Sequence, residues 1–448
     1  MRITVIGVGH VGLVSAAAFA HWGHEVVGLD HDPAKIAQLR TGEPWFHEPD
    51  LTELLTDMVA TGRLRFTTDE TEAYAGAEAA FICVGTPPLA DGSPDLRFVE
   101  AAGRAAVAHA DRDLVLIEKS TVPAATGARL EQTIAAERLR LEVPHRIEVA
   151  SNPEFLREGA AVADTLHPDR VVYGTGSTMA RETLRELYKP LVAEHDVPVV
   201  ETDVATAELI KHASNAFLAT RISFINAVAR ICDRVGADVT VVADGMGHDP
   251  RIGRAFLHAG LGYGGSCFPK DIDAFAHLAA SVGEPFELLE AVRDVNVGQR
   301  QLVVDRLTTE LWHLQGKTVA LLGAAFKPGT DDLREAPSLY LADLLREQGA
   351  EVRLYDPVAT EALARERPEL SATDDLARAM HGAHAVVVCT DWPQIAALTP
   401  ADYLHHLTYP VVIDGRNVHD PAPMLAAGVR YHAIGRRSAA TTGHGVRS

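Results

Sequence analysis

The sequence predicts an α/β fold in which two doubly wound parallel sheets are joined by a long central helix. Short apolar runs alternate with helical patterns in the first and last thirds of the chain, which is typical of parallel α/β sheets. A run without Gly or Pro, from about Val204 to Val235, separates these thirds. The first apolar run of each third leads into a similar Gly-containing turn. We therefore expect two related domains with a helix between them.

The first third contains five strand candidates. They are residues 2–6, 25–29, 80–84, 114–118 and 147–150. These runs end in Gly, Asp or Thr-Pro, and ligands in open parallel sheets bind beyond the carboxyl ends of the strands. We expect the first binding site at this edge of the sheet.

The middle of the chain predicts one long helix. Its pattern opens at Ala205 and meets no Gly or Pro until Gly236. At about 1.5 Å per residue it would span about 45 Å, more than one domain edge needs. We expect it to connect two domains and to offer a surface for a homodimer.

The last third repeats the organisation of the first. Its strand candidates are residues 318–322, 351–355, 385–389 and 411–413, and it carries a longer insert containing Lys327, Thr330 and Arg334. We expect an N-terminal domain at 1–203, a central helical segment at 204–300, a C-terminal domain at 301–436 and a disordered polar tail at 437–448.

Composition narrows the class of protein. The chain has 448 residues, of which 47% are hydrophobic and 23% charged, and its formal net charge is −20. This charge argues against nucleic-acid binding, and the absence of an apolar run of 18 residues argues against a membrane-spanning helix. A strand starts at once after Met1, which leaves no room for a signal peptide. The four cysteines are scattered without metal or disulfide spacing, so we expect a cytoplasmic protein without a metal site.

A dinucleotide site is predicted at the first strand. Gly7-Val8-Gly9-His10-Val11-Gly12 follows that strand and opens a helix, and Asp30 ends the second strand. Gly7 permits the tight turn, Gly9 lets backbone approach a pyrophosphate, and Gly12 permits close helix–strand packing. The Asp30 carboxylate can accept from a ribose 2′-hydroxyl and would repel a 2′-phosphate, so we expect NAD in preference to NADP. The equivalent turn of the last third, Gly323-Ala324-Ala325, lacks the pattern, so we expect a different ligand there.

One cysteine has the surroundings of a nucleophile. Cys267 lies in Gly262-Tyr263-Gly264-Gly265-Ser266-Cys267-Phe268-Pro269-Lys270-Asp271. Pro269 in a first helical turn would place Cys267 at the positive end of a helix, and Lys270 would also favour the thiolate. Asp271 would lie on the same side and manage a water or a proton. The other cysteines, Cys83, Cys232 and Cys389, sit in apolar runs typical of core residues.

Ordered motifs over nearly the whole chain resemble the UDP-glucose 6-dehydrogenase family, within the UDP-glucose/GDP-mannose dehydrogenase group. Besides GVGHVG and GYGGSCFPKD, the matching blocks are VGTP at 84–87, EKSTVP at 118–123, SNPEFLREG at 151–159, AELIKHASNAFLA at 207–219, DPRIG at 249–253, FKPGTDDLREAPS at 326–338 and DGRN at 414–417. The resemblance implies that both domains are Rossmann-like and that the C-terminal one binds UDP.

The resemblance also implies a reaction, the four-electron oxidation of UDP-glucose to UDP-glucuronate with two NAD. Cys267 would attack an intermediate aldehyde to form a thiohemiacetal and then a thioester. Lys211 and Asn215, at i and i+4 of the long helix, would stabilise the oxyanion. Glu154 and Asp271 would act as bases, and Thr121 would orient a water or the nicotinamide.

Further residues are implied as ligand contacts. The family pattern assigns to NAD the residues Gly7, Gly9, Val11, Gly12, Asp30, Lys35, Thr86, Thr121, Glu154, Lys270 and Arg334. It assigns to the UDP-sugar Phe155, Leu156 and Arg157, largely through backbone, and Lys211, Asn215, Arg251, Phe256, Gly264, Phe268, Lys327 and Arg416. In the family, an arginine at the position of Arg251 reaches across a dimer interface.

Three alternatives remain. The same chemistry could act on UDP-N-acetylglucosamine, UDP-N-acetylmannosamine or GDP-mannose. A two-electron β-hydroxyacid dehydrogenase would share the dinucleotide domain and a Lys/Asn pair, but it lacks the Cys267 loop. A non-catalytic binding protein would have lost catalytic groups, whereas all are present here. His10 and Ala124-Ala125-Thr126 depart from the family pattern without removing a chemical group.

Overall fold

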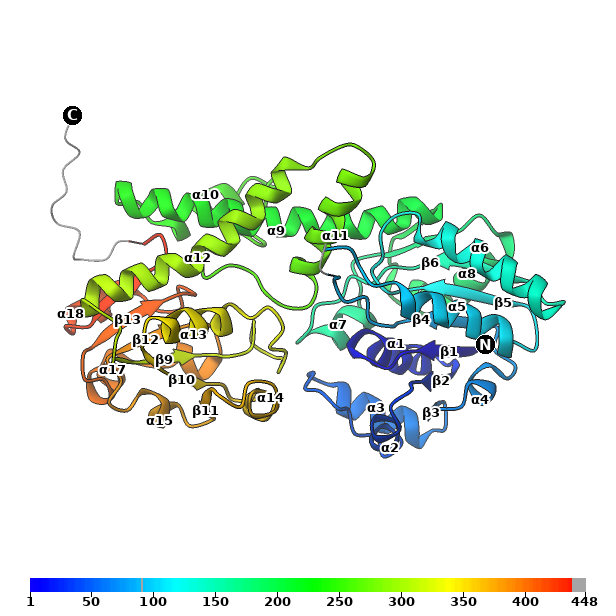
Figure 1. The fold of residues 1–448 in the computed structure, drawn as a ribbon, viewed down its shortest axis with the longest axis horizontal. Helices are drawn as coiled ribbons and strands as arrows, with labels where there is room; N and C mark the ends of the chain where they lie inside the picture. The colour runs from blue at the N-terminus through cyan, green and yellow to red at the C-terminus, as the bar shows by residue number, and fades with distance from the viewer. Residues whose placement is uncertain (90–91, 437–448) are drawn as a thin grey trace. The chain divides into compact units, whose positions relative to one another are not determined.

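The computed structural model describes residues 1–89 and 92–436, which form two compact units (Figure 1). The first unit comprises Met1–Ser214 and Lys270–Glu284. The second comprises Asn215–Pro269 and the described chain from Pro285 onwards. The predicted tail, 437–448, lies outside the described residues.

Within the described residues, the first unit is built on an eight-stranded sheet of order β3-β2-β1-β4-β5-β6-β7-β8. Four of the five expected strands are confirmed within one residue, and β4 ends two residues earlier than expected. The strands are β1 (Arg2–Ile6), β2 (Glu25–Leu29), β3 (Leu64–Thr67), β4 (Ala79–Ile82), β5 (Leu114–Glu118), β6 (Ile147–Ser151), β7 (Val171–Gly174) and β8 (Val199–Thr202).

The expected doubly wound parallel sheet is confirmed, with one antiparallel pairing. β6 and β7 run antiparallel, with Ser151 opposite Gly174, whereas every other pairing of this sheet is parallel. The connection from β6 to β7 contains only a short helix, α7 (Ala161–Leu166), and three of the four residues of the edge strand β8 are exposed. Neither strand alternates clearly, so the pattern did not predict them.

Helices cover both faces of this sheet because successive strand side chains point to opposite faces. Val5 and Ile117 pack in one apolar cluster, while Ile6 and Leu116 pack in another. The first face carries α1 (His10–His21), α2 (Pro33–Leu39), α3 (Leu51–Ala60), α7 (Ala161–Leu166) and α8 (Thr178–His195). The second carries α4 (Glu70–Tyr74), α5 (Arg97–His109) and α6 (Thr126–Leu141).

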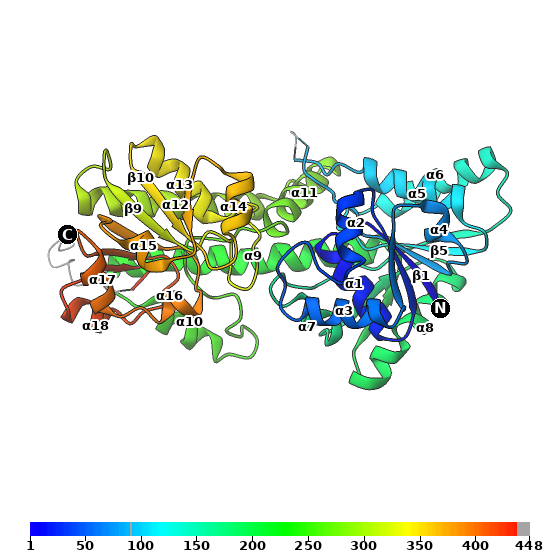
Figure 2. The same ribbon diagram turned by 90° about the horizontal axis from the view of Figure 1, so that it is seen from below.

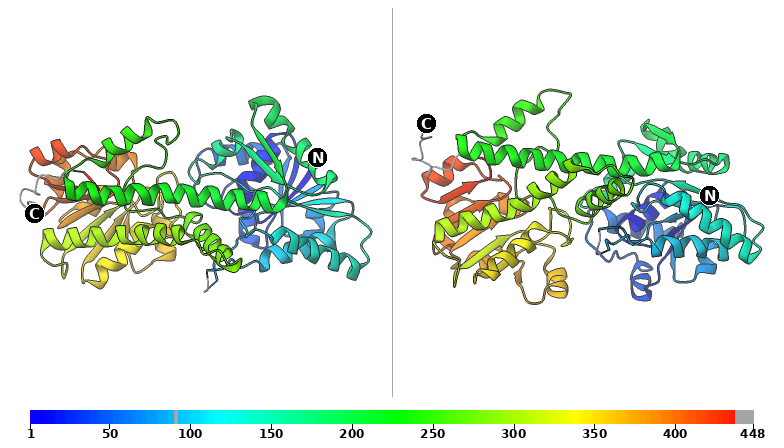
Figure 3. Two further views of the ribbon diagram at one scale, coloured as in Figure 1. Left: turned by 90° about the horizontal axis from the view of Figure 1, so that it is seen from above. Right: turned by 45° about the horizontal axis from the view of Figure 1, so that its top comes forward.

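The predicted central helix is confirmed as α9 (Val204–Val235), 32 residues without a break (Figure 3). It ends where Gly236 adopts φ +73°, a left-handed conformation that glycine tolerates and that commonly terminates helices. The central segment also contains α10 (Val239–Gly247), α11 (Phe268–Ser281) and α12 (Glu287–Leu311). No helix in the described part of the chain is both long and apolar enough to cross a membrane.

The second unit contains, within the described residues, a six-stranded parallel sheet of order β11-β10-β9-β12-β13-β14. This is the strand order 3-2-1-4-5-6 of dinucleotide-binding folds. The strands are β9 (Thr318–Leu322), β10 (Glu351–Tyr355), β11 (Ser371–Thr373), β12 (Ala385–Val388), β13 (Val411–Asp414) and β14 (Arg430–Ala433). All four expected strands are present.

This sheet is also doubly wound (Figure 2). Leu321 packs with α12, α13 (Pro337–Glu347) and α14 (Thr360–Glu366). Leu322, on the opposite face, packs in a second cluster. That cluster takes in α15 (Leu376–Met380), α16 (Pro393–Ala396), α17 (Pro400–His406) and α18 (Pro421–Ala426).

Candidate active site

The turn after β1 has the geometry of a phosphate-binding turn. Gly7 adopts φ +87° and donates its N–H to Leu29 O at 2.7 Å, while a Cβ at Gly12 would lie 1.9 Å from Gly7 O. A Cβ at Gly9 would meet no described atom within 4 Å. α1 begins at His10 without a side-chain cap, so its first N–H groups, including that of Val11, are available to an anion.

Asp30 is fixed at the end of β2. Its carboxylate accepts from the N–H groups of Val8 and Asp32, each at 3.1 Å, and from Lys35 Nζ at 3.1 Å. Burial alone would raise the pKa of Asp30, but these donors outweigh burial and lower it. The ionised carboxylate can accept from a ribose hydroxyl and repels a further phosphate.

The last third contains the same backbone turn, but the aspartate that follows its second strand has different partners. Gly323 adopts φ +98° and donates to Tyr355 O at 2.8 Å, as Gly7 does to Leu29. Asp356, the equivalent of Asp30, is fully buried and accepts from Ala324 N, Ala325 N, Val358 N, Ala359 N and Trp392 Nε1. The predicted repeat is therefore real, but its aspartate is satisfied within the protein.

The loops after β4 and β5 meet beside this site. Thr86 Oγ1 donates to Thr121 O at 3.1 Å, and Ser120 Oγ donates to Val84 O at 2.7 Å. The two threonines assigned to NAD by the family pattern are thus held on adjacent loops at the carboxyl edge of the sheet.

A buried ion pair lies at the end of β6. Lys211 Nζ, from α9, donates to Glu154 Oε1 at 2.9 Å, and Glu154 Oε2 accepts from Leu156 N at 2.8 Å. Two cations lie over the ring of Phe155, Arg170 at 3.9 Å and Lys211 at 5.5 Å from the ring centroid. Arg157 has a different environment, since it is paired with Asp164 at 2.7 Å and is largely exposed.

Asp271 is buried among positive charges. Lys270 Nζ donates to its carboxylate at 2.7 Å. Burial would raise the pKa of Asp271, but Lys270, Lys211 and His212 outweigh that effect and lower it. Asp271 is therefore a carboxylate, able to accept a proton.

The second unit holds the cysteine loop. Gly265 adopts φ +84°, and a Cβ there would lie 2.7 Å from the Phe326 ring; at Gly264 it would lie 2.2 Å from Glu335 O. Only glycine fits so close to that backbone. Cys267 is half-buried, its Sγ lies 3.5 Å from Ser266 Oγ, and α11 begins at the next residue, Phe268.

Aromatic and cationic residues of the second unit accompany this loop. The Phe268 ring centroid lies 6.3 Å from that of Phe256, which adopts φ +61°. Arg416 donates through Nε to Cys389 O at 2.6 Å and through Nη2 to Phe326 O at 3.2 Å. Lys327 Nζ lies 5.4 Å from the Phe326 ring centroid.

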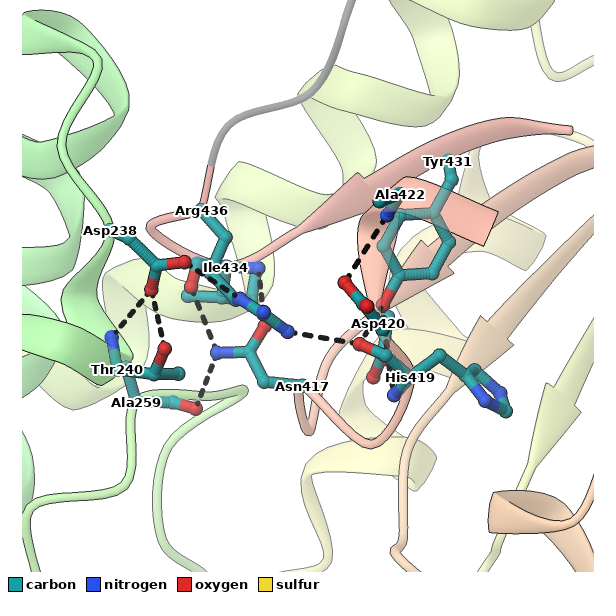
Figure 4. Close-up of polar contacts among 11 residues, drawn as sticks. Asp238, Thr240, Ala259, Asn417, His419, Asp420, Ala422, Tyr431, Ile434 and Arg436 are labelled. Atoms are coloured by element: carbon teal, nitrogen blue, oxygen red, sulfur yellow. Dashed lines mark hydrogen bonds and ion pairs between the residues drawn. The ribbon is translucent and has the colours of Figure 1, made fainter. Parts of the chain in front are cut away.

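Asn417 connects the Arg416 loop to its neighbours (Figure 4). Its side chain donates to Ile434 O at 2.9 Å and to Ala259 O at 3.5 Å, and accepts from Ile434 N at 3.0 Å. Leu261 N also donates to Gly415 O at 3.1 Å. The segment that leads into the cysteine loop is thus bonded directly to the DGRN motif, a role that sequence reasoning did not give to Asn417, although its φ of +56° suits asparagine.

The predicted site residues divide between the two units. The first contains the glycines of the first turn, Asp30, Lys35, Thr86, Thr121, Glu154, Phe155, Leu156, Arg157, Lys211, Lys270 and Asp271. The second contains Asn215, Arg251, Phe256, Gly264, Cys267, Phe268, Lys327, Arg334 and Arg416. Arg334 is paired with Asp332 at 2.6 Å, and Arg251 with Asp249 at 2.6 Å. Asn215 is buried one helical turn after Lys211.

Family models cover most of the chain. Residues 1–192 match the NAD-binding domain of the UDP-glucose/GDP-mannose dehydrogenase family, residues 205–297 its central domain and residues 320–421 its UDP-binding domain. The chain belongs to the UDP-glucose/GDP-mannose dehydrogenase family. The expected class, an NAD-dependent dehydrogenase of nucleotide sugars, is thereby confirmed.

Individual relatives span the full length. The chain is 44% identical to the UDP-glucose 6-dehydrogenase YwqF of Bacillus subtilis, covering 99% of each chain. It is 44% identical to the UDP-glucose 6-dehydrogenase of Pseudomonas aeruginosa, covering 97% of this chain and 98% of the relative. The solved UDP-glucose dehydrogenase of Pyrobaculum islandicum matches with a TM-score of 0.90 and 39% identity over 97% of this chain and 98% of that one.

Proposed function

We propose that the chain oxidises UDP-glucose to UDP-glucuronate, using two NAD and a covalent intermediate on Cys267. The observation that carries this proposal is the glycine-bounded loop that presents Cys267 directly before α11, in a chain similar over its full length to UDP-glucose 6-dehydrogenases. A two-electron dehydrogenase has no need of such a thiol.

The first oxidation converts the C6 alcohol to an aldehyde. The hydroxyl would lose its proton to a base and C6 a hydride, for which NAD would supply the acceptor when bound. Lys211 supports this step because its buried ammonium can stabilise negative charge on the C6 oxygen. Glu154, hydrogen-bonded to that ammonium, is a carboxylate through which the proton can leave.

The second oxidation proceeds on the thiol. The Cys267 thiolate adds to the aldehyde carbon to form a thiohemiacetal, which loses its second hydride to give a thioester. Water then attacks the thioester carbon, the carbon–sulfur bond breaks, and the carboxylate and the thiol are released. Asp271 is the base for that water because it is an ionised, buried carboxylate on α11. Asn215 would donate to the oxyanion, and Thr121 would orient the water or the nicotinamide.

The nucleotide is assigned to the second unit. Lys327 and Arg416 supply the positive charge that a diphosphate requires, and Phe256, Gly264 and Phe268 adjoin the cysteine loop. Asp356 is too buried and too well satisfied to hold a second dinucleotide ribose in this domain. The alternative is the same chemistry on UDP-N-acetylglucosamine, UDP-N-acetylmannosamine or GDP-mannose, and a 28% identical structure is that of a UDP-D-ManNAc dehydrogenase from Pyrococcus horikoshii.

We further infer a homodimer formed through α9. Phe217, Phe224 and Ile231 recur at seven-residue spacing on this helix, and 64%, 50% and 59% of each is exposed. Such an apolar stripe is typical of a helix that packs against a partner. The side chain of Arg251, 88% exposed, is then free to reach a neighbouring subunit once it leaves Asp249.

Two broader assignments accompany the function. We infer an NAD-binding domain at 1–203, a central helical segment at 204–300 and a UDP-binding domain at 301–436. We also infer a cytoplasmic protein, because the four cysteines, all within the described residues, form no disulfide and three of them are buried as thiols.

The test is NADH stoichiometry against a panel of UDP-glucose, UDP-N-acetylglucosamine, UDP-N-acetylmannosamine and GDP-mannose. The proposal requires about two NADH per UDP-glucose consumed, with the other sugars slower. Two NADH from another sugar would replace the substrate but keep the mechanism. One NADH per sugar would exclude the thioester route, and none with any sugar would favour a binding protein.

A further inference from the structure

The loop that follows β5, residues 119–127, is tied to the first turns of α9 at two points. Glu208 accepts from Ala125 N at 2.8 Å and from Gly127 N at 2.9 Å. His212, one turn later on α9, bonds to Val122 O at 2.7 Å. Thr121 lies in this loop, and Lys211 lies on α9 between the two residues that hold it.

The end of this loop packs tightly against α9 and contains one residue in an unfavourable backbone conformation. A Cβ at Gly127 would lie 2.4 Å from the side chain of Val204 and 3.3 Å from Glu208 Oε1. Ala125 adopts φ +78°, a left-handed conformation that costs a non-glycine residue about 1 kcal/mol or more. The bonds to Glu208 are what offset this local strain.

A second buried acid completes the arrangement. Glu118, the last residue of β5, is 1% exposed, and its carboxyl is hydrogen-bonded to that of Glu208. Within the described chain, no N–H or O–H donor other than an acid proton reaches the oxygens of Glu118. Two carboxyl groups can form a hydrogen bond only when one of them carries a proton.

The two acids have unequal surroundings, and this decides where the proton resides. Glu208 accepts two backbone N–H groups, which stabilise its ionised form, whereas Glu118 has no such donor. Burial raises the pKa of Glu118 well above its usual range, and it raises the pKa of Glu208 to about 7. Glu118 is therefore the neutral acid, which donates to the Glu208 carboxylate.

We propose that the Glu118–Glu208 acid pair is a positioning device that holds residues 119–127, and with them Thr121, in the conformation that NAD requires. Neither residue touches the reacting atoms. Glu118 donates its proton to Glu208, and Glu208 holds the backbone at the start of α6. The inference rests on the proposed function for its NAD-binding consequence, but the clamp itself is a property of the first unit.

The test is made in the full-length protein and uses the different hydrogen-bond partners of the two acids. Glu118→Gln keeps a donor of the same shape, so kcat/KM for NAD should remain within about threefold of wild type. Glu208→Gln leaves one acceptor oxygen in place of two. Its side-chain NH₂ group then faces a backbone N–H of Ala125 or Gly127, which loses its acceptor. Leaving a buried N–H unsatisfied costs enough to lower kcat/KM for NAD by about 10- to 100-fold, while KM for the nucleotide sugar should change little.

Hydrogen exchange of the amides of residues 119–127 gives a readout independent of activity. Ala125 and Gly127 should exchange faster in Glu208→Gln and as slowly as wild type in Glu118→Gln. Equal effects of the two substitutions would overturn the proposal, and so would a parallel rise in KM for both substrates. Exchange that differs as expected, in a protein that forms no NADH with any sugar, would support the clamp and refute the proposed function alone.

A further variant covers the case in which Glu208→Gln does not fold. Glu118→Leu retains the volume of the side chain but removes the donated proton, so kcat/KM for NAD should fall at least fivefold below that of Glu118→Gln. Equal values for these two variants would show that the shared proton does not position the loop.

Discussion

Lys211 Nζ lies 2.9 Å from Glu154 Oε1, and the two side chains are only 4% and 5% exposed. A buried pair of this kind costs desolvation energy that surface residues avoid. The α9 helix nevertheless directs Lys211 to the carboxyl edge of the first sheet, where the NAD-site loops gather. This placement supports the proposal that the Lys211 ammonium stabilises an oxyanion.

Replacing Lys211 with Met should affect both stability and catalysis. The substitution leaves Glu154 buried without its partner, so the free energy of unfolding should fall by about 3–5 kcal/mol. Loss of an oxyanion donor should lower kcat by about 10²- to 10³-fold. Chemical denaturation and NADH kinetics measure the two effects. The matched control is Lys189→Met, whose exposed partner is Glu186 at 3.2 Å; it should change stability by less than about 1 kcal/mol. Similar losses in both variants would contradict a special role for Lys211.

Replacing Cys267 with Ala should abolish formation of the uronic acid, because no thioester can form without the thiol. Product analysis by mass spectrometry measures this directly. Cys232→Ala is the control, since Cys232 is 3% exposed in an apolar cluster and burial raises the pKa of its thiol. That control should lose about 1 kcal/mol of stability and keep its activity. A Cys267→Ala enzyme that still made the acid at the wild-type rate would end the thioester mechanism.

Asp30 and Asp356 allow a paired comparison, because they occupy equivalent positions in the two units. Asp30→Asn removes the charge that we propose accepts a ribose hydroxyl, so KM for NAD should rise about tenfold and the preference for NAD over NADP should narrow. Asp356→Asn replaces an acceptor of five donors, so it should lower the melting temperature without altering KM for NAD. An unchanged preference between the two cofactors in Asp30→Asn would refute the assigned role.

His212 should make the protein less stable as pH falls below about 6.5. Burial lowers the pKa of His212 from its usual 6.5, and nearby Asp271 only partly offsets this effect. The unfolded chain then binds a proton that the folded chain does not, so stability is lost from pH 6.5 down to the folded pKa, by up to about 1.4 kcal/mol per pH unit. Denaturation at pH 7.5 and 5.5 should show a smaller loss in His212→Gln than in wild type. The control is His31→Gln, at a side chain that is 98% exposed, and it should lose as much stability between pH 7.5 and 5.5 as wild type does. An equally large loss in His212→Gln would contradict the prediction.

The apolar stripe of α9 predicts the site of dimerisation. Phe224→Glu places a charge in the middle of Phe217, Phe224 and Ile231, so sedimentation should show a shift from dimer towards monomer. Leu139→Glu, on α6, changes an equally apolar residue that is 83% exposed and should leave the oligomer intact. A wild-type monomer, or dissociation by both variants, would exclude this interface.

Local signals were strong enough to predict the parts of the chain that obey simple periodicities. The Gly7 turn and the strand before it follow from a motif in which each glycine has a steric reason. The 32-residue helix from Val204 to Val235 follows from the absence of any helix breaker. The antiparallel β7 and the exposed edge strand β8 could not be predicted, because short strands of mixed polarity carry no clear alternation.

The chemistry was likewise only partly visible in the sequence. Lys211, Glu154 and Cys267 stood out through their motifs. Glu118 and Glu208 did not, since a glutamate at the end of a strand and another in a first helical turn are ordinary until their burial is known. Their shared proton depends on two elements, β5 and α9, that are 90 residues apart in sequence and adjacent only in the folded unit.

The sequence by itself determined the α/β class and the repeated strand–turn–helix unit, and it predicted an NAD-binding turn at Gly7 and a nucleophilic Cys267, because each depends on residues close together in the chain. Only the tertiary structure decided the orientation of β7, the satisfaction of Asp356, the pairing of Lys211 with Glu154 and the acid pair that holds the Thr121 loop. These features depend on burial and on contacts between distant segments, where desolvation makes each polar group require a specific partner.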